Sequence, residues 1–177
     1  HKGDVLVLYG DTPLLTAATL ERLRGVLDQG AGVAVLGFEA ADPTGYGRLL
    51  TDANGGVVAI REHADASDAE RQVRLCNSGV MAFRVPDIVG LLRRIGSGNA
   101  KGELYLTDAL ELARSDGHAT RFVVCTEEEV LGVNDRTQLA AAEAIWQRRR
   151  RHEVMLGGVT LVAPETVWLS YDTVIGR

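Results

Sequence analysis

The sequence begins with a short, wholly apolar run that ends at a glycine and an aspartate. Residues 5–8 read Val-Leu-Val-Leu, and Tyr9, Gly10 and Asp11 follow at once. A continuous apolar run of this length is typical of a strand buried on both faces, as in a parallel sheet. Open α/β sheets bind their ligands just beyond the carboxyl ends of such strands. The run therefore predicts an α/β fold and makes Asp11 the first candidate for a functional side chain.

The segments after this strand continue an α/β pattern. Thr16 can cap a helix whose apolar residues recur at helical spacing, and the glycines within residues 30–32 end that helix. Residues 33–38 then read as a second strand. Because a strand–helix–strand crossover of this kind joins parallel strands, we expect both strands to belong to one sheet.

The remaining elements are predicted from turn signals and periodicity. After Gly158 the sequence changes to short apolar units at near-regular spacing, which predicts the beginning of a repetitive β structure. Because the first strand starts almost at residue 4, the chain reads as the middle of a fold. The other predicted elements are a hairpin of residues 48–51 and 57–60, a short helix or loop at 64–71, a strand at 79–83, a helix opened by Pro86, a helix from about residue 103 to 115, a strand at 120–124 and a long helix at 134–151.

Composition and charge exclude several classes of function. Apolar residues make up 46% and charged residues 24% of the chain, as in soluble globular proteins. The net charge of −5 argues against nucleic acid as a partner, and the basic run at residues 148–151 reads as a solvated helix end. No apolar run approaches the roughly 20 residues that span a bilayer, and the start does not resemble a signal peptide. Cys76 and Cys125 stand alone and read as small buried hydrophobes, which fits a reducing cytoplasm.

Two positions can supply oxygen ligands to magnesium. This ion prefers one or two protein carboxylates, with phosphates and waters around them, and an asparagine carbonyl is an acceptable neutral ligand. Asp11 fits the first description and Asn134 the second. Each has an ordinary alternative, because Gly-Asp-Thr-Pro is also good turn chemistry and Asn134 is placed to cap the next helix. Spacing alone leaves Asp11 balanced between the two readings and favours a cap for Asn134.

Three more positions have the chemistry to bind a sugar or a phosphate. Gly47, in the glycine-rich loop at residues 42–48, allows close approach of the backbone. Glu62 can accept two hydrogen bonds from hydroxyls, and Asn77 offers both a donor and an acceptor beside a glycine. An ordinary loop, a solvated glutamate and a turn explain these three positions equally well or better. His63 has no metal partner at useful spacing and is given no catalytic role.

The order of these motifs is more specific than any one of them. In their succession they closely resemble the bacterial bifunctional enzymes that acetylate glucosamine-1-phosphate and then uridylylate the product. The resemblance covers essentially the whole chain, and residues 158–167 are similar to the start of that family's left-handed β-helix. The motifs are Leu8-Tyr-Gly-Asp-Thr-Pro-Leu14, Asp42-Pro-Thr-Gly-Tyr-Gly-Arg48, Ile60-Arg-Glu-His63, Asn77-Ser-Gly79, Gly102-Glu-Leu-Tyr-Leu-Thr-Asp108 and Gly132-Val-Asn-Asp-Arg136.

The resemblance implies an α/β, Rossmann-like nucleotide-diphospho-sugar transferase fold whose N-terminal part is absent from this chain. Residues 1–136 are then expected to form a partial uridylyltransferase domain, residues 137–157 a linker helix, and residues 158–177 the start of the β-helix acetyltransferase domain. The full-length protein is expected to be a homotrimer assembled through that β-helix, of which this chain contains little.

The resemblance also implies an activity. The family transfers UMP from UTP to N-acetylglucosamine-1-phosphate with magnesium, releases pyrophosphate, and so forms UDP-N-acetylglucosamine for peptidoglycan and lipopolysaccharide synthesis. The positions that match Asp11 and Asn134 hold the magnesium ion in that family. Those that match Tyr9 and Gly10 lie along the nucleotide sugar. The positions that contact its N-acetylglucosamine part match Gly47, Glu62, Asn77 and Asn134.

The chain departs from the family in lacking its first segment, which carries a glycine-rich phosphate loop and the residues that read uracil. We expect the chain as given to lack the acetyltransferase reaction, and to be weak or inactive as a uridylyltransferase unless the missing part is supplied separately. Two alternatives stay open. One is a sugar-phosphate nucleotidyltransferase for another base or sugar, and the other is a non-catalytic module that binds sugar nucleotides.

Overall fold

The helices and strands follow the alternating order that the sequence predicts. The structure, a computed structural model, describes residues 3–176. Its strands are β1 (Val5–Val7), β2 (Val33–Glu39), β3 (Arg48–Thr51), β4 (Val57–Arg61), β5 (Leu75–Phe83) and β6 (Thr120–Cys125). Its helices are α1 (Ala17–Asp28), α2 (Asp68–Arg71), α3 (Ile88–Leu92), α4 (Asp108–Ser115) and α5 (Arg136–Leu156), with short 3-10 helices η1 (Glu127–Val130) and η2 (Pro164–Thr166).

The strands form one mixed sheet. β4, β3, β5, β2 and β6 lie side by side in that order, and β1 pairs with β5. β2 and β6 run parallel, whereas β5 is antiparallel to both β1 and β2. Phe83 pairs with both Val5 and Val33, so β1 and β2 flank β5 and run in the same direction. The carboxyl ends of β1, β2 and β6 therefore point to the same edge of the sheet.

The first strand differs from its prediction. The apolar run at residues 5–8 predicts burial on both faces among parallel neighbours, and this is wrong. β1 contains three half-buried residues and is antiparallel to β5. Because β5 lies between β1 and β2, the crossover through α1 joins two parallel strands that are not adjacent. Among the described residues β1 has no second neighbouring strand, which leaves its side chains half-buried.

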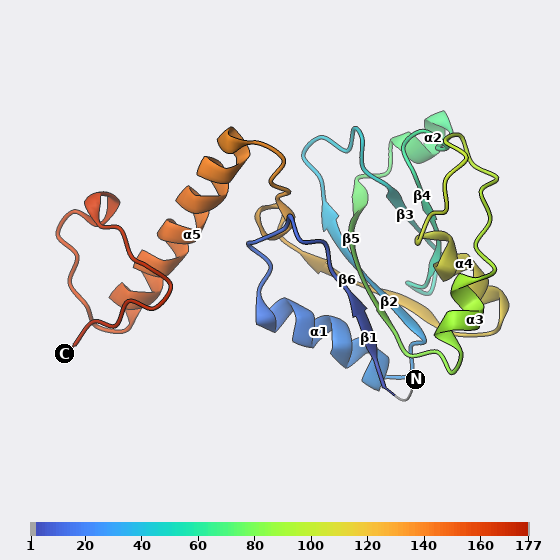
Figure 1. Cartoon of the computed structure of the whole chain (residues 1–177), viewed down its shortest axis with the longest axis horizontal. Helices are drawn as coiled ribbons and strands as arrows, with labels where there is room; N and C mark the ends of the chain where they lie inside the picture. The colour runs from blue at the N-terminus through green and yellow to red at the C-terminus, as the bar shows by residue number, and fades with distance from the viewer. Residues whose placement is uncertain (1–2, 177) are drawn as a thin grey trace.

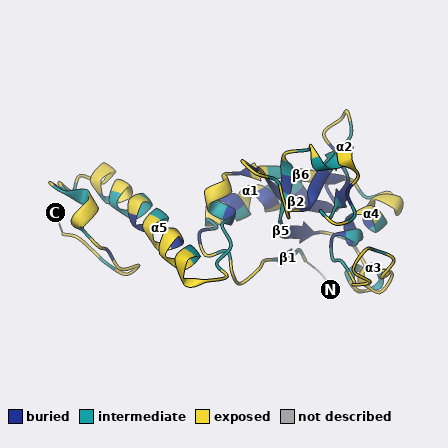
Figure 2. Ribbon diagram, turned by 90° about the horizontal axis from the view of Figure 1, so that it is seen from above, coloured by how far each residue is buried: buried dark blue, intermediate teal, exposed yellow. Residues whose placement is uncertain are grey.

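The side chains of β2 pack alternately on the two faces of the sheet. Leu36 lies in one core cluster with Leu23 of α1. Its neighbour Val35 lies in a second cluster with Leu110 of α4. All four side chains are fully buried, and each such burial stabilises the fold by about 1.5–3 kcal/mol. Figures 1 and 2 show the strands between α1 on one side and α4 on the other.

Some predicted helix boundaries hold and others move. Thr16 caps α1 as predicted, because its hydroxyl accepts a hydrogen bond from the Thr19 amide at 3.2 Å. α3 begins at Ile88 and not at Pro86. Asp87 caps it, since the Asp87 carboxylate accepts a hydrogen bond from the backbone N–H of Gly90 at 2.8 Å. α4 begins later than predicted, at Asp108, because residues 99–103 form a loop held by the Asn99 side chain.

The cap of α5 is Asp135 rather than Asn134. Asp135 Oδ1 accepts hydrogen bonds from the amides of Thr137 and Gln138, each at 2.8 Å. The cap reading of Asn134 is therefore wrong, and its side chain is left for another role.

The basic run at residues 148–151 is not simply a solvated face, because two of its arginines hold the end of the described chain against α5. Guanidinium groups can satisfy carbonyls of a segment that lacks strand partners. Arg148 pairs with Glu128 on the surface. The other three arginines of the run, Arg149, Arg150 and Arg151, donate to the carbonyl oxygens of Leu14, Thr173 and Val167.

The segment after α5 folds back along that helix, away from the sheet (Figure 1). Leu169 forms two backbone hydrogen bonds with the side chain of Gln147, at 2.8 and 3.0 Å. No strand is present in residues 158–176. A turn of a β-solenoid needs a neighbouring turn for its backbone hydrogen bonds, and the described residues provide none. The start of a left-handed β-helix therefore stays a prediction. None of the described helices has the length and apolarity that crossing a membrane requires.

Candidate functional site

A cavity of about 350 Å³ lies where the carboxyl ends of β1, β2 and β6 meet. Open α/β sheets bind their ligands at this position. The walls come from the segments that follow β1, β2 and β4, from the first half of β5, and from residues 130–134 after β6. The lining residues are Tyr9, Asp11, Thr12, Phe38, Gly45, Tyr46, Gly47, Glu62, Asn77, Ser78, Gly79, Thr107, Val130, Leu131, Gly132, Asn134 and Gln138.

This cavity contains six of the seven residues that the sequence nominates for a site. They stand in five separate segments of the chain, and the folding of the sheet brings them together. Gly10 is the exception, since it is not among the lining residues. The six are Tyr9, Asp11, Gly47, Glu62, Asn77 and Asn134.

Asp11 and Asn134 direct their side chains to the same place beside Gly132. A methyl group added at Gly132 would lie 3.9 Å from Asp11 Oδ2 and 3.7 Å from Asn134 Nδ2. The backbone N–H of Val133 donates to the carbonyl oxygen of Asp11 at 2.8 Å, which fixes the two segments against each other. Rotation of the Asn134 amide by half a turn would present its oxygen at the same place. Both side chains are exposed, so a ligand can reach them.

The donors at this point fit magnesium better than other common metals. Among residues 3–176 no three His, Cys, Asp or Glu side chains are grouped so that they could hold a metal ion by themselves. Zinc and calcium sites need more protein ligands than one carboxylate and one amide. Magnesium retains waters and binds substrate phosphates, so Asp11 and Asn134 suffice as its protein ligands.

The ring of Tyr9 packs directly on the backbone of Gly79. Gly79 has a φ of +85°, and a Cβ added there would lie 2.0 Å from Tyr9 Cε2. Glycine is the residue that tolerates both the positive φ and the contact. Tyr9 remains 52% exposed, so one side of its ring is held by the protein while the rest faces the cavity.

Gly47 and Glu62 are close neighbours on the opposite wall. A Cβ added at Gly47 would lie 3.2 Å from Glu62 Oε1, which is tighter than an ordinary contact. The hydroxyl of Thr107 donates to the same oxygen at 3.3 Å. Glu62 is therefore oriented by a buried partner and keeps acceptor capacity for hydroxyl groups of a ligand.

Asn77 forms hydrogen bonds with two other residues of the cavity wall, Gly47 and Gly79. Its backbone N–H donates to the carbonyl oxygen of Gly47 at 2.8 Å. Its side-chain oxygen accepts from the Gly79 amide at 3.0 Å, which leaves the side-chain NH₂ group free to donate to a ligand.

The loop after β2 is held by local hydrogen bonds. The Asp42 carboxylate accepts from the Thr44 amide at 3.0 Å, and that bond is the main reason why the pKa of Asp42 is lowered. The ring of Tyr46 meets that of Phe38 edge to face at 5.0 Å, and burial raises the pKa of Tyr46. These contacts fix the conformation of the loop, which places Gly45 and Gly47 in the cavity lining.

Several polar lining residues have no role in the sequence prediction, and Thr107 and Gln138 are two that form hydrogen bonds with nominated residues. Thr107 lies inside the motif of residues 102–108 that contributes to the family resemblance, so the sequence marks its segment without giving it a function. The side-chain oxygen of Gln138 accepts a hydrogen bond from the backbone N–H of Asn134 at 2.6 Å. No pattern in the sequence indicates that contact, because Gln138 sits within an ordinary helical stretch.

Curated relatives resemble this chain along nearly its whole length. A bifunctional protein GlmU of Azorhizobium caulinodans is 60% identical over 174 residues, which are 98% of this chain and 39% of that protein. Proteins of the same name are 60% identical in Xanthobacter autotrophicus and 55% identical in Agrobacterium fabrum, over the same number of residues. The chain thus spans about 39% of the length of the curated relatives that it matches. No protein-family model matches it.

Solved structures of low identity show the same fold. A CMP:2-keto-3-deoxy-manno-octonic acid synthetase complexed with CTP has a TM-score of 0.56 at 16% identity, over 82% of this chain and 62% of that one. A nucleoside-diphosphate-sugar pyrophosphorylase of Vibrio cholerae RC9 has a TM-score of 0.50 at 18% identity, over 66% and 48%. The predicted Rossmann-like nucleotidyltransferase fold is thereby confirmed.

Proposed function

Over the 174 residues that align, the chain belongs to the family of the proteins named bifunctional protein GlmU, and on that premise we propose that it forms much of a nucleotidyltransferase domain that makes UDP-N-acetylglucosamine. The proposed substrates are UTP and N-acetylglucosamine-1-phosphate. Residues 1–136 are the proposed extent of that domain in this chain, residues 137–157 a linker helix, and residues 158–177 the start of a second domain.

The observation that carries this proposal is the single cavity that collects six nominated residues from five segments. Its two walls differ in chemistry. One wall contains Asp11 and Asn134, which suit a cation and the phosphates that it binds. The other contains Gly47, Glu62 and Asn77, which suit a sugar with hydroxyl and amide groups. A nucleotide sugar has both kinds of group, because its diphosphate is joined directly to its sugar.

The proposed reaction needs positioning more than it needs a reactive side chain. A phosphate oxygen of the sugar phosphate attacks the α-phosphorus of UTP, and the bond from that phosphorus to the bridging oxygen breaks, so that pyrophosphate leaves. Transfer of this kind is accelerated by holding the groups in line and by stabilising charge on the phosphates. Glu62, held by Thr107, and Asn77 orient the sugar, while the ring of Tyr9 supports the nucleotide sugar.

Asp11 and Asn134 are the proposed ligands of the magnesium ion. When bound there, the ion supplies electrostatic stabilisation of phosphate charge. The hydrogen bond between Val133 and Asp11 keeps the two ligands in register, so the protein contributes a preformed half of the site.

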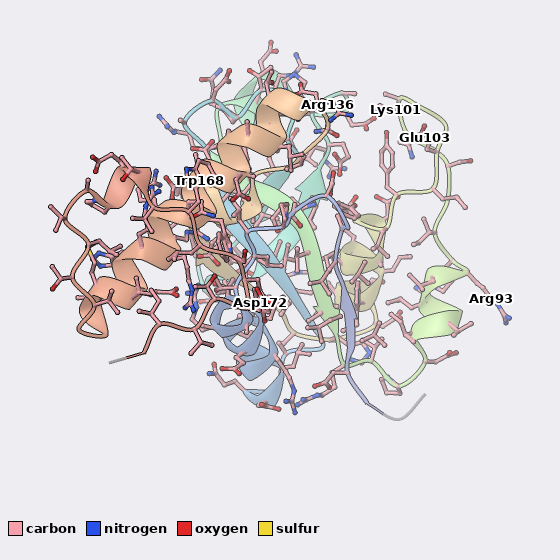
Figure 3. The ribbon with its side chains drawn as sticks, turned by 60° about the vertical axis from the view of Figure 1, so that its left-hand side comes forward. Arg93, Lys101, Glu103, Arg136, Trp168 and Asp172 are labelled. Carbon is pink, nitrogen blue, oxygen red and sulfur yellow. The ribbon has the colours of Figure 1, made fainter. Side chains whose placement is uncertain are left out.

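Isothermal titration of the chain with UDP-N-acetylglucosamine, with and without magnesium, tests the proposal. We expect binding that is strengthened by magnesium, and a loss of roughly tenfold or more in Asp11→Ala with magnesium present. Asp172→Ala is the matched control, because Asp172 is an exposed aspartate on the C-terminal segment and does not line the cavity (Figure 3). Equal binding by Asp11→Ala and the parent would remove Asp11 from the site.

Competition with other sugar nucleotides identifies the ligand class. Tighter binding of a cytidine or thymidine sugar nucleotide than of UDP-N-acetylglucosamine would favour a nucleotidyltransferase of other specificity. Pyrophosphate release from UTP and N-acetylglucosamine-1-phosphate, measured on the longest natural form of the protein, separates catalysis from binding alone. Binding without turnover there would favour the non-catalytic module.

A further inference from the structure

Arg48 is an arginine buried as deeply as the core. Its side chain is 1% exposed and is the largest among the fully buried side chains. The residue begins β3 and pairs with Arg61 of β4 and Cys76 of β5, so it sits inside the sheet. Burying a guanidinium is unfavourable unless its N–H groups find acceptors. The position of those acceptors therefore shows what the side chain holds.

The guanidinium donates to neutral groups on three different segments. Nη1 donates to the carbonyl oxygen of Tyr46 in the loop after β2. Nη2 donates to the carbonyl oxygen of Arg71 at the end of α2, at 3.3 Å. The same nitrogen lies 3.3 Å from Nδ1 of His63. One buried side chain thus joins the loop, α2 and the end of β4.

Two of these segments form one wall of the candidate cavity. Tyr46 precedes Gly47, and His63 follows Glu62 directly in the chain. Gly47 and Glu62 are so close that a Cβ added at Gly47 would lie only 3.2 Å from Glu62 Oε1. Holding Tyr46 and His63 on one guanidinium therefore fixes the spacing between Gly47 and the Glu62 carboxylate.

The contact with His63 completes a set of neutral acceptors. A guanidinium has donors and no acceptor, so Nδ1 of His63 is the acceptor of the hydrogen bond from Arg48 Nη2. The other two acceptors are backbone carbonyl oxygens, those of Tyr46 and Arg71. Removing any of these acceptors or the guanidinium itself therefore loosens the segments that it joins.

We propose that Arg48 is a positioning residue for the sugar side of the candidate site, and that its contacts with Tyr46 and His63 hold Gly47 and Glu62 in place. The ligand in this statement rests on the proposed function, whereas the effect on the loop does not. Loss of these contacts releases residues 42–47 and the end of β4 together. Sugar-nucleotide affinity is therefore expected to fall when the contacts are removed.

The experiment measures hydrogen–deuterium exchange of residues 42–47 and the affinity for UDP-N-acetylglucosamine. In Arg48→Met we expect faster exchange in the loop and binding weaker by about tenfold. Arg93→Met is the control, because Arg93 is an exposed arginine directly after α3 (Figure 3) and does not line the cavity.

Two variants of His63 separate positioning from general stability. His63→Gln keeps a neutral acceptor for the guanidinium and should match the parent in loop exchange and affinity, whereas His63→Leu removes the acceptor and should show faster loop exchange and weaker binding. If Arg48→Met does not fold, by circular dichroism, the comparison of these two variants decides alone.

Two results would overturn the inference. One is the same loop exchange in His63→Leu and His63→Gln, and the other is a folded Arg48→Met with unchanged loop exchange. Failure of the parent to bind any sugar nucleotide would refute the proposed function, while the exchange measurements would still decide the role of Arg48.

Discussion

The backbone N–H of Val133 donates a hydrogen bond to the carbonyl oxygen of Asp11, with 2.8 Å between the two atoms. This bond joins the end of β1 to the segment that leads into α5. It uses only backbone atoms, so both the Asp11 carboxylate and the Asn134 amide stay free beside Gly132. Changing either side chain therefore tests the site without removing the contact that builds it.

A double-mutant cycle on these side chains should show strong coupling. We expect Asp11→Asn and Asn134→Ala each to weaken magnesium-dependent binding of UDP-N-acetylglucosamine roughly tenfold or more. The double variant should lose much less than the product of the two effects, because either change already spoils the shared magnesium site. Titration calorimetry with and without magnesium gives all four affinities. Strictly additive losses would mean that the two residues act at separate places.

Replacing Gly79 by alanine should displace the ring of Tyr9. The new Cβ would overlap that ring, and the positive φ of Gly79 adds about 1–2 kcal/mol of backbone strain. We expect lower thermal stability and weaker binding of the nucleotide sugar. Gly55→Ala is the matched control, because Gly55 has a φ of +72° and open space around it in the β3–β4 hairpin. It should lose similar stability and keep its affinity. Equal affinities in the two variants would show that the Tyr9–Gly79 contact does not serve binding.

Local signals in the sequence predict most of the elements, because each depends on neighbouring residues. The cap at Thr16, the strand at residues 33–38 and the hairpin around Gly55 are all present. The neighbours of β1 are set by β5, which comes from a distant part of the chain and inserts between β1 and β2. The pattern of residues 5–8 contains no information about the insertion of β5 between the two strands.

The site shows the same division between local and distant information. Asp11 and Glu62 follow strands and can be nominated from that position alone. The choice between Asn134 and Asp135 as the cap of α5 cannot be made from sequence, because both residue types cap helices well. The structure decides it through the bonds of Asp135 to the amides of Thr137 and Gln138. Thr107 becomes relevant only when α4 packs beside β4 and brings its hydroxyl to Glu62.

The cap of α5 should make that helix sensitive to acid. Hydrogen bonds from Thr137 and Gln138 lower the pKa of Asp135 in the folded protein. The stabilisation is fully present above the ordinary aspartate pKa of about 3.9, and it is lost as the pH falls through the lower, folded value. Asp135→Ala should therefore melt at a lower temperature than the parent at neutral pH. The two melting temperatures should converge at acidic pH, below the lowered pKa of Asp135 in the folded protein. Circular dichroism at both pH values measures this, and a constant difference between the variants would contradict it.

Gln147 should control how firmly the C-terminal segment is held. It is 3% exposed, and its side-chain amide forms both backbone hydrogen bonds of Leu169. Gln147→Leu has a similar volume but leaves a buried N–H and a buried carbonyl without partners, each at a cost of about 1–3 kcal/mol. We expect the C-terminal segment to open more often. Chymotrypsin should then cut beside Trp168 and Tyr171, which are both exposed, about ten times faster, because cleavage follows the population of the open form.

The control for this prediction is Gln72→Leu, because Gln72 is exposed at the end of α2. Binding of UDP-N-acetylglucosamine should be the same in all three proteins, since neither glutamine lines the cavity. Faster cleavage together with lost binding would show that the C-terminal segment and the cavity unfold as one unit.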